Sequence, residues 1–202
     1  MKVNKVWIPL LMLLLVCFGT GSSALADDAK CNLAYDVEKK AVERFKKDKA
    51  EGLKLFKMAY DYCPQDPKLA FSLGLAFFRY GSAKEAEEYV RKAVEKDRTN
   101  PEWLNFLAWL MLESGSDRAK ALGYARDAAK LRPESPPVAD TLIRALAENG
   151  QAYEALAEGA KAVNKWPKDE KISRRYGGAK DAYLSYFLKK TDAGAHEEAV
   201  QG

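Results

Sequence analysis

Histidine is almost absent from this chain of 202 residues, in which His196 is the single example. A hydrolase of the Ser–His–acid type needs a histidine held in a pocket as its base. His196 lies in Ala195-His196-Glu197-Glu198, in a segment that we expect to be a solvated tail, and it is not part of a helical His-Glu-x-x-His zinc motif. We therefore expect no enzyme, and an unconventional carboxylate site is the remaining enzymatic alternative.

Other chemical signatures are also missing. The three cysteines form no Cys-x-x-Cys pair, which excludes zinc ribbons, thioredoxin-like motifs and covalent haem attachment. The sequence contains no Gly-Lys-Ser/Thr phosphate loop. The net charge of +4 is spread along the chain without a basic block, which argues against a nucleic-acid surface. These absences predict no cofactor, no metal, no nucleic-acid partner and no small-molecule substrate.

The amino-terminal segment reads as a secretory signal peptide over residues 1–26. Lys2 and Lys5 precede the apolar run 6–18, and a small polar stretch ends in Ala24-Leu25-Ala26. The run has 13 residues, whereas a membrane-spanning helix needs about 20, so a permanent anchor is the weaker alternative. Cleavage after Ala26 would deliver a periplasmic or secreted chain.

Cys17 leaves a second processing route open. Leu14-Leu15-Val16-Cys17 resembles a bacterial lipoprotein box, although Val16 is branched where such boxes normally have a small residue. The alternative localisation is a membrane-anchored lipoprotein, and we expect membrane association only if Cys17 is lipidated.

A period of 34 to 35 residues runs through the rest of the chain. Small residues recur in two series, and each member of the second series lies seven residues after a member of the first. Within each series, successive members are 34, 35 and 34 residues apart. Residues seven apart lie on one helical face, where small side chains let a second helix approach closely. The first series is Gly52, Ala86, Ala121 and Ala155, and the second is Ala59, Ala93, Ala128 and Ala162.

Glycine and proline mark the ends of the helices that this period predicts. A glycine can end a helix in the left-handed conformation, and a proline disfavours helical geometry in the residue before it. Asn100-Pro101-Glu102 has the pattern of a helix amino terminus, with an asparagine cap and proline in the first turn. We expect first helices to end at Gly81, Gly115 and Gly150, and second helices to end before Pro64, Pro133 and Pro167.

In this period and in segments such as Leu107-Ala108-Trp109-Leu110 and 148–155, residues 33–169 resemble the bacterial tetratricopeptide-repeat family. The resemblance implies an all-α fold, a right-handed superhelical solenoid of about four helix-turn-helix repeats plus a carboxy-terminal capping helix. The first repeat departs from the pattern, because Lys39 and Lys40 stand where apolar and small residues are usual. The expected repeats are 33–66, 67–100, 101–135 and 136–169, and the expected capping helix is 170–190. Together they form a domain 27–190, which a flexible tail, 191–202, follows.

Two cysteines, Cys31 and Cys63, remain after the expected cleavage. An even pair in a secreted chain indicates a disulfide, with two buried thiols as the alternative. In the repeat arrangement, Cys31 would lie just before the first helix and Cys63 at the end of its antiparallel partner, which makes the two residues neighbours. Closing this loop stabilises a fold by about 3–4 kcal/mol in the chain-entropy model.

The resemblance also implies a binding surface, since the first helices of such repeats line a concave groove. We expect an adaptor or scaffold that binds a peptide or protein partner there, in envelope protein assembly. The alternative is a structural component of an envelope complex, such as a pilus, secretion or outer-membrane assembly. Whether the aromatic members face the groove or pack between helices stays open. The expected contact residues are Lys68, Phe71, Leu75, Phe78, Arg79, Asn105, Trp109, Leu112, Arg144 and Arg174.

Overall fold

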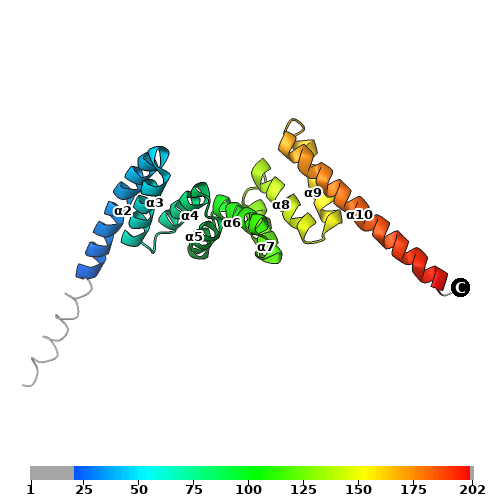
Figure 1. Cartoon of the computed structure of the whole chain (residues 1–202), viewed down its shortest axis with the longest axis horizontal. Coiled ribbons are helices and arrows are strands. Elements are labelled where there is room, and N and C mark those ends of the chain that lie inside the picture. Colours follow the sequence, from blue (N-terminus) through cyan, green and yellow to red (C-terminus); the bar gives the residue numbers. More distant parts are fainter. Residues whose placement is uncertain (1–20, 201–202) are drawn as a thin grey trace, which may run out of the picture. The chain divides into compact units, whose positions relative to one another are not determined.

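The computed structural model describes the backbone of residues 21–200 and the side chains of residues 28–189. Within these residues the chain is all-helical and has no strand, which confirms the expected fold class (Figure 1). The helices are α2 (Gly21–Lys47), α3 (Lys49–Tyr62), α4 (Pro67–Tyr80), α5 (Ala83–Lys96), α6 (Pro101–Ser114), α7 (Arg118–Leu131), α8 (Pro136–Glu148), α9 (Ala152–Lys165) and α10 (Glu170–Val200).

These helices belong to two units, one ending at Ser82 and the other beginning at Ala83. The described part of the first unit holds α2, α3 and α4, and that of the second holds α5 to α10. The boundary falls inside the second expected repeat, between its two helices.

In the first unit, α3 packs against both α2 and α4. The core contains Ala34 and Val37 from α2, Ala59 from α3 and Leu69 from α4. Cys63, the residue that follows α3, also belongs to it. Helix α2 therefore turns an apolar face towards α3.

A glycine allows α3 to approach the backbone of α2 closely. A Cβ atom added at Gly52 in α3 would lie 2.4 Å from the Cα atom of Phe45 in α2. A contact with backbone cannot be relieved by rotating a side chain, so the repeat position that carries alanine elsewhere requires glycine here.

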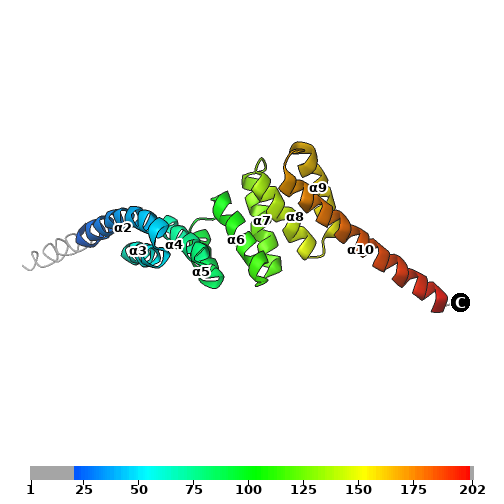
Figure 2. The ribbon, with the colours of Figure 1, turned by 45° about the horizontal axis from the view of Figure 1, so that its top comes forward.

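In the second unit, consecutive helices pack as antiparallel hairpins, α6 with α7 and α8 with α9, and α10 packs against α8 and α9 (Figure 2). The core of this unit consists mainly of aliphatic side chains. Leu104 and Leu107 come from α6, Ile143 from α8 and Ile172 from α10, and each is fully buried. The terminal helix α10 thus covers the last hairpin, as a capping helix must.

The repeated small residues lie where the period predicts. All eight members of the two series are buried. Each member of the first series stands at the fourth residue of its helix, in α3, α5, α7 and α9. The period in the sequence is therefore a period of helix–helix contacts.

The helix ends also follow the sequence signals. The Asn100 side chain accepts hydrogen bonds from the backbone N–H groups of Glu102 and Trp103, at 3.1 and 3.2 Å. Gly81, Gly115 and Gly150 have φ values of 104°, 66° and 75°, the left-handed region that suits glycine. Helices α3, α7 and α9 each end two residues before a proline.

Two expected boundaries differ from the structure. Helix α2 begins at Gly21 rather than near residue 33, so Cys31 lies inside this helix and not before it. Helix α10 continues to Val200, so residue 190 does not mark the end of the helical backbone. Residues 1–20, including Cys17 and the apolar run, lie outside the described residues, as does the side chain of His196. In the part of the chain that the structure describes, no helix combines the length and the apolar character needed to span a membrane.

Candidate protein-binding surfaces

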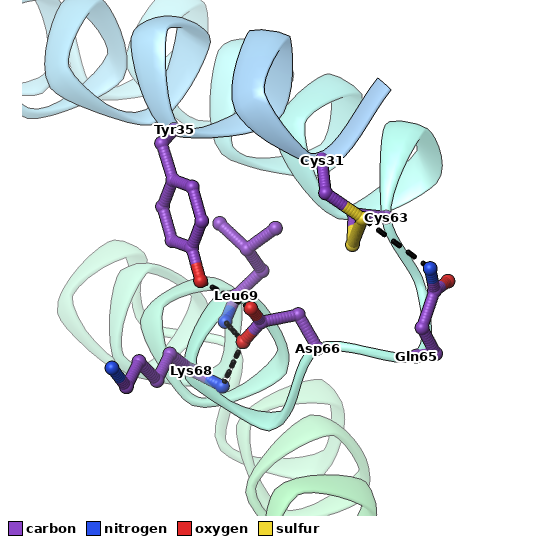
Figure 3. The surroundings of a disulfide bond; sticks show 7 residues. All are labelled: Cys31, Tyr35, Cys63, Gln65, Asp66, Lys68 and Leu69. Carbon is purple, nitrogen blue, oxygen red and sulfur yellow. Dashed lines mark hydrogen bonds between the residues drawn. A yellow bond between two sulfur atoms is a disulfide. The ribbon is translucent and has the colours of Figure 1, made fainter. Parts of the chain in front are cut away.

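A disulfide links Cys31 in α2 to Cys63, the residue that follows α3, with the two Cα atoms 4.9 Å apart (Figure 3). The expected pairing is confirmed. The Gln65 side chain donates a hydrogen bond from Nε2 to Sγ of Cys31, at 3.3 Å. The bond therefore joins the first helix to the loop between α3 and α4.

Tyr35 provides a second link, one helical turn beyond Cys31. Its hydroxyl donates a hydrogen bond to the Asp66 carboxylate, and both residues point towards each other in Figure 3. The same carboxylate caps α4, because it accepts from the backbone N–H groups of Lys68 at 2.7 Å and Leu69 at 3.4 Å. The hydrogen bond to Asp66, and then burial, raise the pKa of Tyr35 to about 12.

Lys49 forms a third link at the other end of α4. Its ammonium group donates to the backbone oxygen of Arg79, at 3.3 Å. Tyr35 therefore meets the start of α4, and Lys49, which follows α2 in the chain, meets its end. Helices α2 and α4 must run in the same direction between these two contacts.

A pocket of about 150 Å³ opens in the first unit between these links. Its α2 residues recur at spacings of three and four, which places them on one face of the helix. Apolar side chains dominate the wall of the pocket, and polar or charged side chains lie at its two ends. Glu38 of α2 and Ser72 of α4 come first along their helices, and Lys46 of α2 and Arg79 of α4 come last. The residues of this tethered pocket are Glu38, Val42, Phe45, Lys46, Phe56, Ser72, Leu75, Ala76 and Arg79.

The second unit presents a different surface along α6, α8 and α10, three helices that contact one another in sequence. Asn105, Asp140 and Arg175 occupy equivalent positions on them, 35 residues apart. Trp109 lies one turn after Asn105, and its ring stacks on Phe106 with centroids 5.9 Å apart. We call this surface the polar face, and it consists of Asn105, Trp109, Glu113, Asp140, Arg144, Glu148 and Arg175.

Asn105 is the unusual member of the polar face. Its Oδ1 atom is buried, and among the described residues it has no hydrogen-bond partner. A buried acceptor without a donor costs about 1–3 kcal/mol, so such an atom in a native protein requires an explanation.

Arg144 holds two glutamates on this face. It forms an ion pair with Glu113 on α6 and another with Glu148, at 2.6 Å. Burial disfavours the charged guanidinium, but the hydrogen bonds to Glu148 and Glu113 outweigh burial and raise the pKa of Arg144. Glu148 also meets Arg118 at 3.4 Å, which extends the network to α7.

Asp140 and Arg175 make a third ion pair of the polar face. The Arg175 Nε atom lies 2.7 Å from Oδ1 of Asp140, and Nη2 lies 3.4 Å from Oδ2. Asp140 is only 4% exposed, so the pair satisfies a carboxylate that would otherwise be buried alone. This contact fixes α10 against α8.

The expected contact residues have different degrees of access. Lys68, Arg79 and Arg174 are exposed, and Phe71, Leu75, Phe78, Asn105, Trp109 and Arg144 are half-buried. Leu112 is 4% exposed and packs in the core of the second unit. Its assignment to a binding surface is therefore corrected, because its apolar side chain is part of the hydrophobic core.

Val42, Phe45 and Phe56 line the tethered pocket but are not among the contact residues expected from the sequence. The first repeat departs from the family pattern at Lys39 and Lys40, both of which are exposed, and this departure hid the register of α2. The spacing of Glu38, Val42 and Phe45 was the available signal. Among the described residues, no cluster of His, Cys, Asp or Glu could hold a metal ion.

Sequence comparison finds no matching family model and no matching curated protein. Comparison of structures does find similar chains. A crystal structure of MamA has a TM-score of 0.66 and 19% identity, over 79% of this chain and 89% of MamA. A MamA fragment from Desulfovibrio magneticus RS-1 has a TM-score of 0.66 and 17% identity, over 84% of this chain and 96% of the fragment.

PilF from Pseudomonas aeruginosa is also similar, with a TM-score of 0.58 and 18% identity over 83% of this chain and 73% of PilF. At these identities the likeness concerns the fold. MamA and PilF are helical-repeat proteins of the tetratricopeptide type. This chain therefore has the tetratricopeptide-repeat solenoid fold that its sequence period predicts.

Proposed function

We propose that this protein is an exported, non-enzymatic adaptor or scaffold that binds a segment of a peptide or protein partner along the polar face. The fold supports this role, because stacked helical repeats offer extended surfaces to partners. Envelope protein assembly is the process that we propose for it.

The observation that carries the proposal is the buried, unpartnered Oδ1 atom of Asn105. Asn105 as a whole is only half-buried, so a rotation of its amide would bring Oδ1 to the surface, where a backbone N–H group of an incoming segment would supply the missing donor. The half-buried Trp109 lies one turn away and offers apolar contact area, a common property of residues that dominate binding energy. Arg144 is already held by Glu113 and Glu148, so its guanidinium needs little reordering when a partner arrives.

Asn105→Leu is the most informative variant. It removes the buried unpaired oxygen, so the free energy of unfolding should stay equal or rise, whereas affinity for the partner should fall. A purely structural asparagine would give the opposite result, a loss of stability with unchanged affinity. Urea unfolding and quantitative binding to the captured partner measure the two quantities.

The partner can be captured in the native host by a photo-crosslinking residue at the exposed Glu102 of α6. Capture should fall strongly in Trp109→Ala and Asn105→Leu. Tyr153→Ala is the matched control, since this aromatic residue of α9 is 71% exposed and lies outside the polar face. Equal capture by all three variants would refute the proposed role of the polar face.

Export is tested separately, by the mass of the mature amino terminus. Asp27 as the first residue would support secretion or periplasmic release. An acylated Cys17 as the first residue would contradict it and favour the membrane-anchored alternative.

A further inference from the structure

We propose that the tethered pocket of the first unit binds a phenylalanine or leucine side chain of a partner peptide that carries an acidic residue close by. The inference rests on the proposed function in one respect, that the partner is a polypeptide. It adds a second site and the chemistry of the segment that this site selects.

The volume and the wall of the pocket define the apolar part of the ligand. A cavity of about 150 Å³ lined by aliphatic and aromatic side chains is large enough to bind benzene. Val42 is 42% exposed and Leu75 is half-buried, so the wall is open to a side chain that arrives from solvent. The rings of Phe45 and Phe56 pack edge to face, with their centroids 6.0 Å apart, and form an aromatic wall.

The charges at one end of the pocket define the acidic part. Among the residues that the structure describes, the guanidinium of Arg79 has no ion-pair partner, and α4 carries no acidic residue. Lys46 lines the same end, although it also pairs with Glu43 at 2.8 Å. A carboxylate next to the bound apolar side chain would make a bidentate pair with Arg79, the geometry that arginine favours.

Glu38 gives the pocket a direction. It lines the opposite end from Arg79, so a ligand carboxylate is attracted to one end and repelled from the other. The pocket therefore selects a peptide by the side on which the acidic residue lies, and not only by its apolar side chain.

The three links around the pocket keep it in shape before binding. The disulfide joins α2 to the end of α3, the Tyr35–Asp66 hydrogen bond joins α2 to the start of α4, and the Lys49–Arg79 contact joins the start of α3 to the end of α4. A preformed site loses less conformational entropy on binding than a site that must assemble.

The experiment uses the whole oxidised protein and fluorescein-labelled peptides of Gly and Ser. Each peptide carries one Phe and one Asp, and the Asp lies one to three residues before or after the Phe. In one matched set of peptides Lys replaces the Asp, and in another Ala replaces the Phe. Fluorescence anisotropy should show that at least one Phe–Asp peptide binds about tenfold more tightly than both of its matched peptides. If no peptide shows this preference, the inference is wrong.

Charge reversal gives the sharpest arm of the test. Arg79→Glu should shift the preference from the Asp peptide to its Lys counterpart, whereas Lys57→Glu, an exposed cation of α3 outside the pocket, should leave it unchanged. Identical behaviour of the two variants would overturn the inference.

Filling the pocket is the second arm. Val42→Trp should lower affinity about tenfold or more, and Leu33→Trp, at a 49% exposed position of the same helix outside the pocket, should have no effect. Sedimentation of both variants tests another occupant. A wild-type dimer that only Val42→Trp dissociates would show that a second copy fills the pocket, which overturns the inference.

This result can be separated from the proposed function. The Trp109→Ala variant should still bind the Phe–Asp peptide, because Trp109 lies in the other unit. If partner capture depends on Asn105 and Trp109 but no peptide binds the first unit, the adaptor role stands and only the pocket inference fails.

Discussion

The two units of the protein hold their helices together by different means. In the second unit, α6 alone contributes four large, fully buried side chains, Leu104, Leu107, Leu110 and Met111. In the first unit, Cys63 is the only described residue of the α2–α3 hairpin in that group, and it belongs to the disulfide. The α2–α3 hairpin thus replaces part of a hydrophobic core with a covalent link.

The comparison teaches how a repeat with few large buried side chains can be stabilised. Each repeat of a solenoid depends on its own packing and on contacts with its neighbours. A weaker core can be offset by a disulfide, which destabilises the unfolded chain rather than adding contacts to the folded one. The first repeat could therefore depart from the family pattern at Lys39 and Lys40 and still fold.

The largest expected effect is the loss of the disulfide, which would remove this difference between the units. Reduction, or replacement of both cysteines by serine, should destabilise the first unit by about 3–4 kcal/mol. Hydrogen exchange followed by mass spectrometry should show faster exchange in α2 and α3 and unchanged exchange in α6 to α9. Equal acceleration in both units would contradict the assignment of the link to the first hairpin alone.

Gly52→Ala should destabilise the same hairpin by up to about 3 kcal/mol, because the added methyl group meets the backbone of Phe45. Gly123→Ala is the control in the second unit. No atom lies within 4 Å of a Cβ at Gly123, and alanine should stabilise its helix by up to about 1 kcal/mol. Urea unfolding measures both changes, and a destabilised Gly123→Ala would show that the glycine effect is not steric.

Arg175→Met tests the second unit. It leaves the buried carboxylate of Asp140 unpaired and should cost about 2 kcal/mol, less than a fully buried pair because Arg175 is half-exposed. The double variant with Asp140→Leu should recover most of this loss. If the double variant is no more stable than Arg175→Met, the cost comes from packing rather than from the orphaned charge.

Tyr35→Phe should have the smallest effect, about 1 kcal/mol, because it removes one partly exposed hydrogen bond to a carboxylate. The pKa of Tyr35 is raised to about 12, above its ordinary value near 10. The stabilisation is therefore complete below about pH 10 and is lost as the pH rises towards 12. Unfolding measured against pH should show the two proteins converging in this range, and a constant difference would contradict the assigned hydrogen bond.

The local features of the fold were predictable from the sequence. Small residues at a fixed period, glycines at positive φ and the cap at Asn100 depend on a few neighbouring residues, and each was found where expected. The disulfide was predictable because the repeat arrangement brings the ends of one hairpin together. The start of α2 was missed, since the helix extends through residues that carry no repeat signal.

The surfaces were less predictable, because they depend on distances between helices. The family resemblance implied a groove position for Leu112, but the burial of its side chain depends on how α6 contacts its neighbours. The pairing of Arg144 with Glu113 and of Arg175 with Asp140 joins residues 31 and 35 positions apart. No sequence pattern states which of the many surface charges will meet.

The Asp66 carboxylate starts α4 and also receives the Tyr35 hydroxyl. Asp48 makes only the first kind of contact, to the backbone N–H groups of Ala50 and Glu51. Serine or asparagine can serve as a helix cap in place of aspartate, so position 48 should tolerate these substitutions more readily than position 66. Among descendants of this sequence, position 66 should retain its acid and change together with position 35.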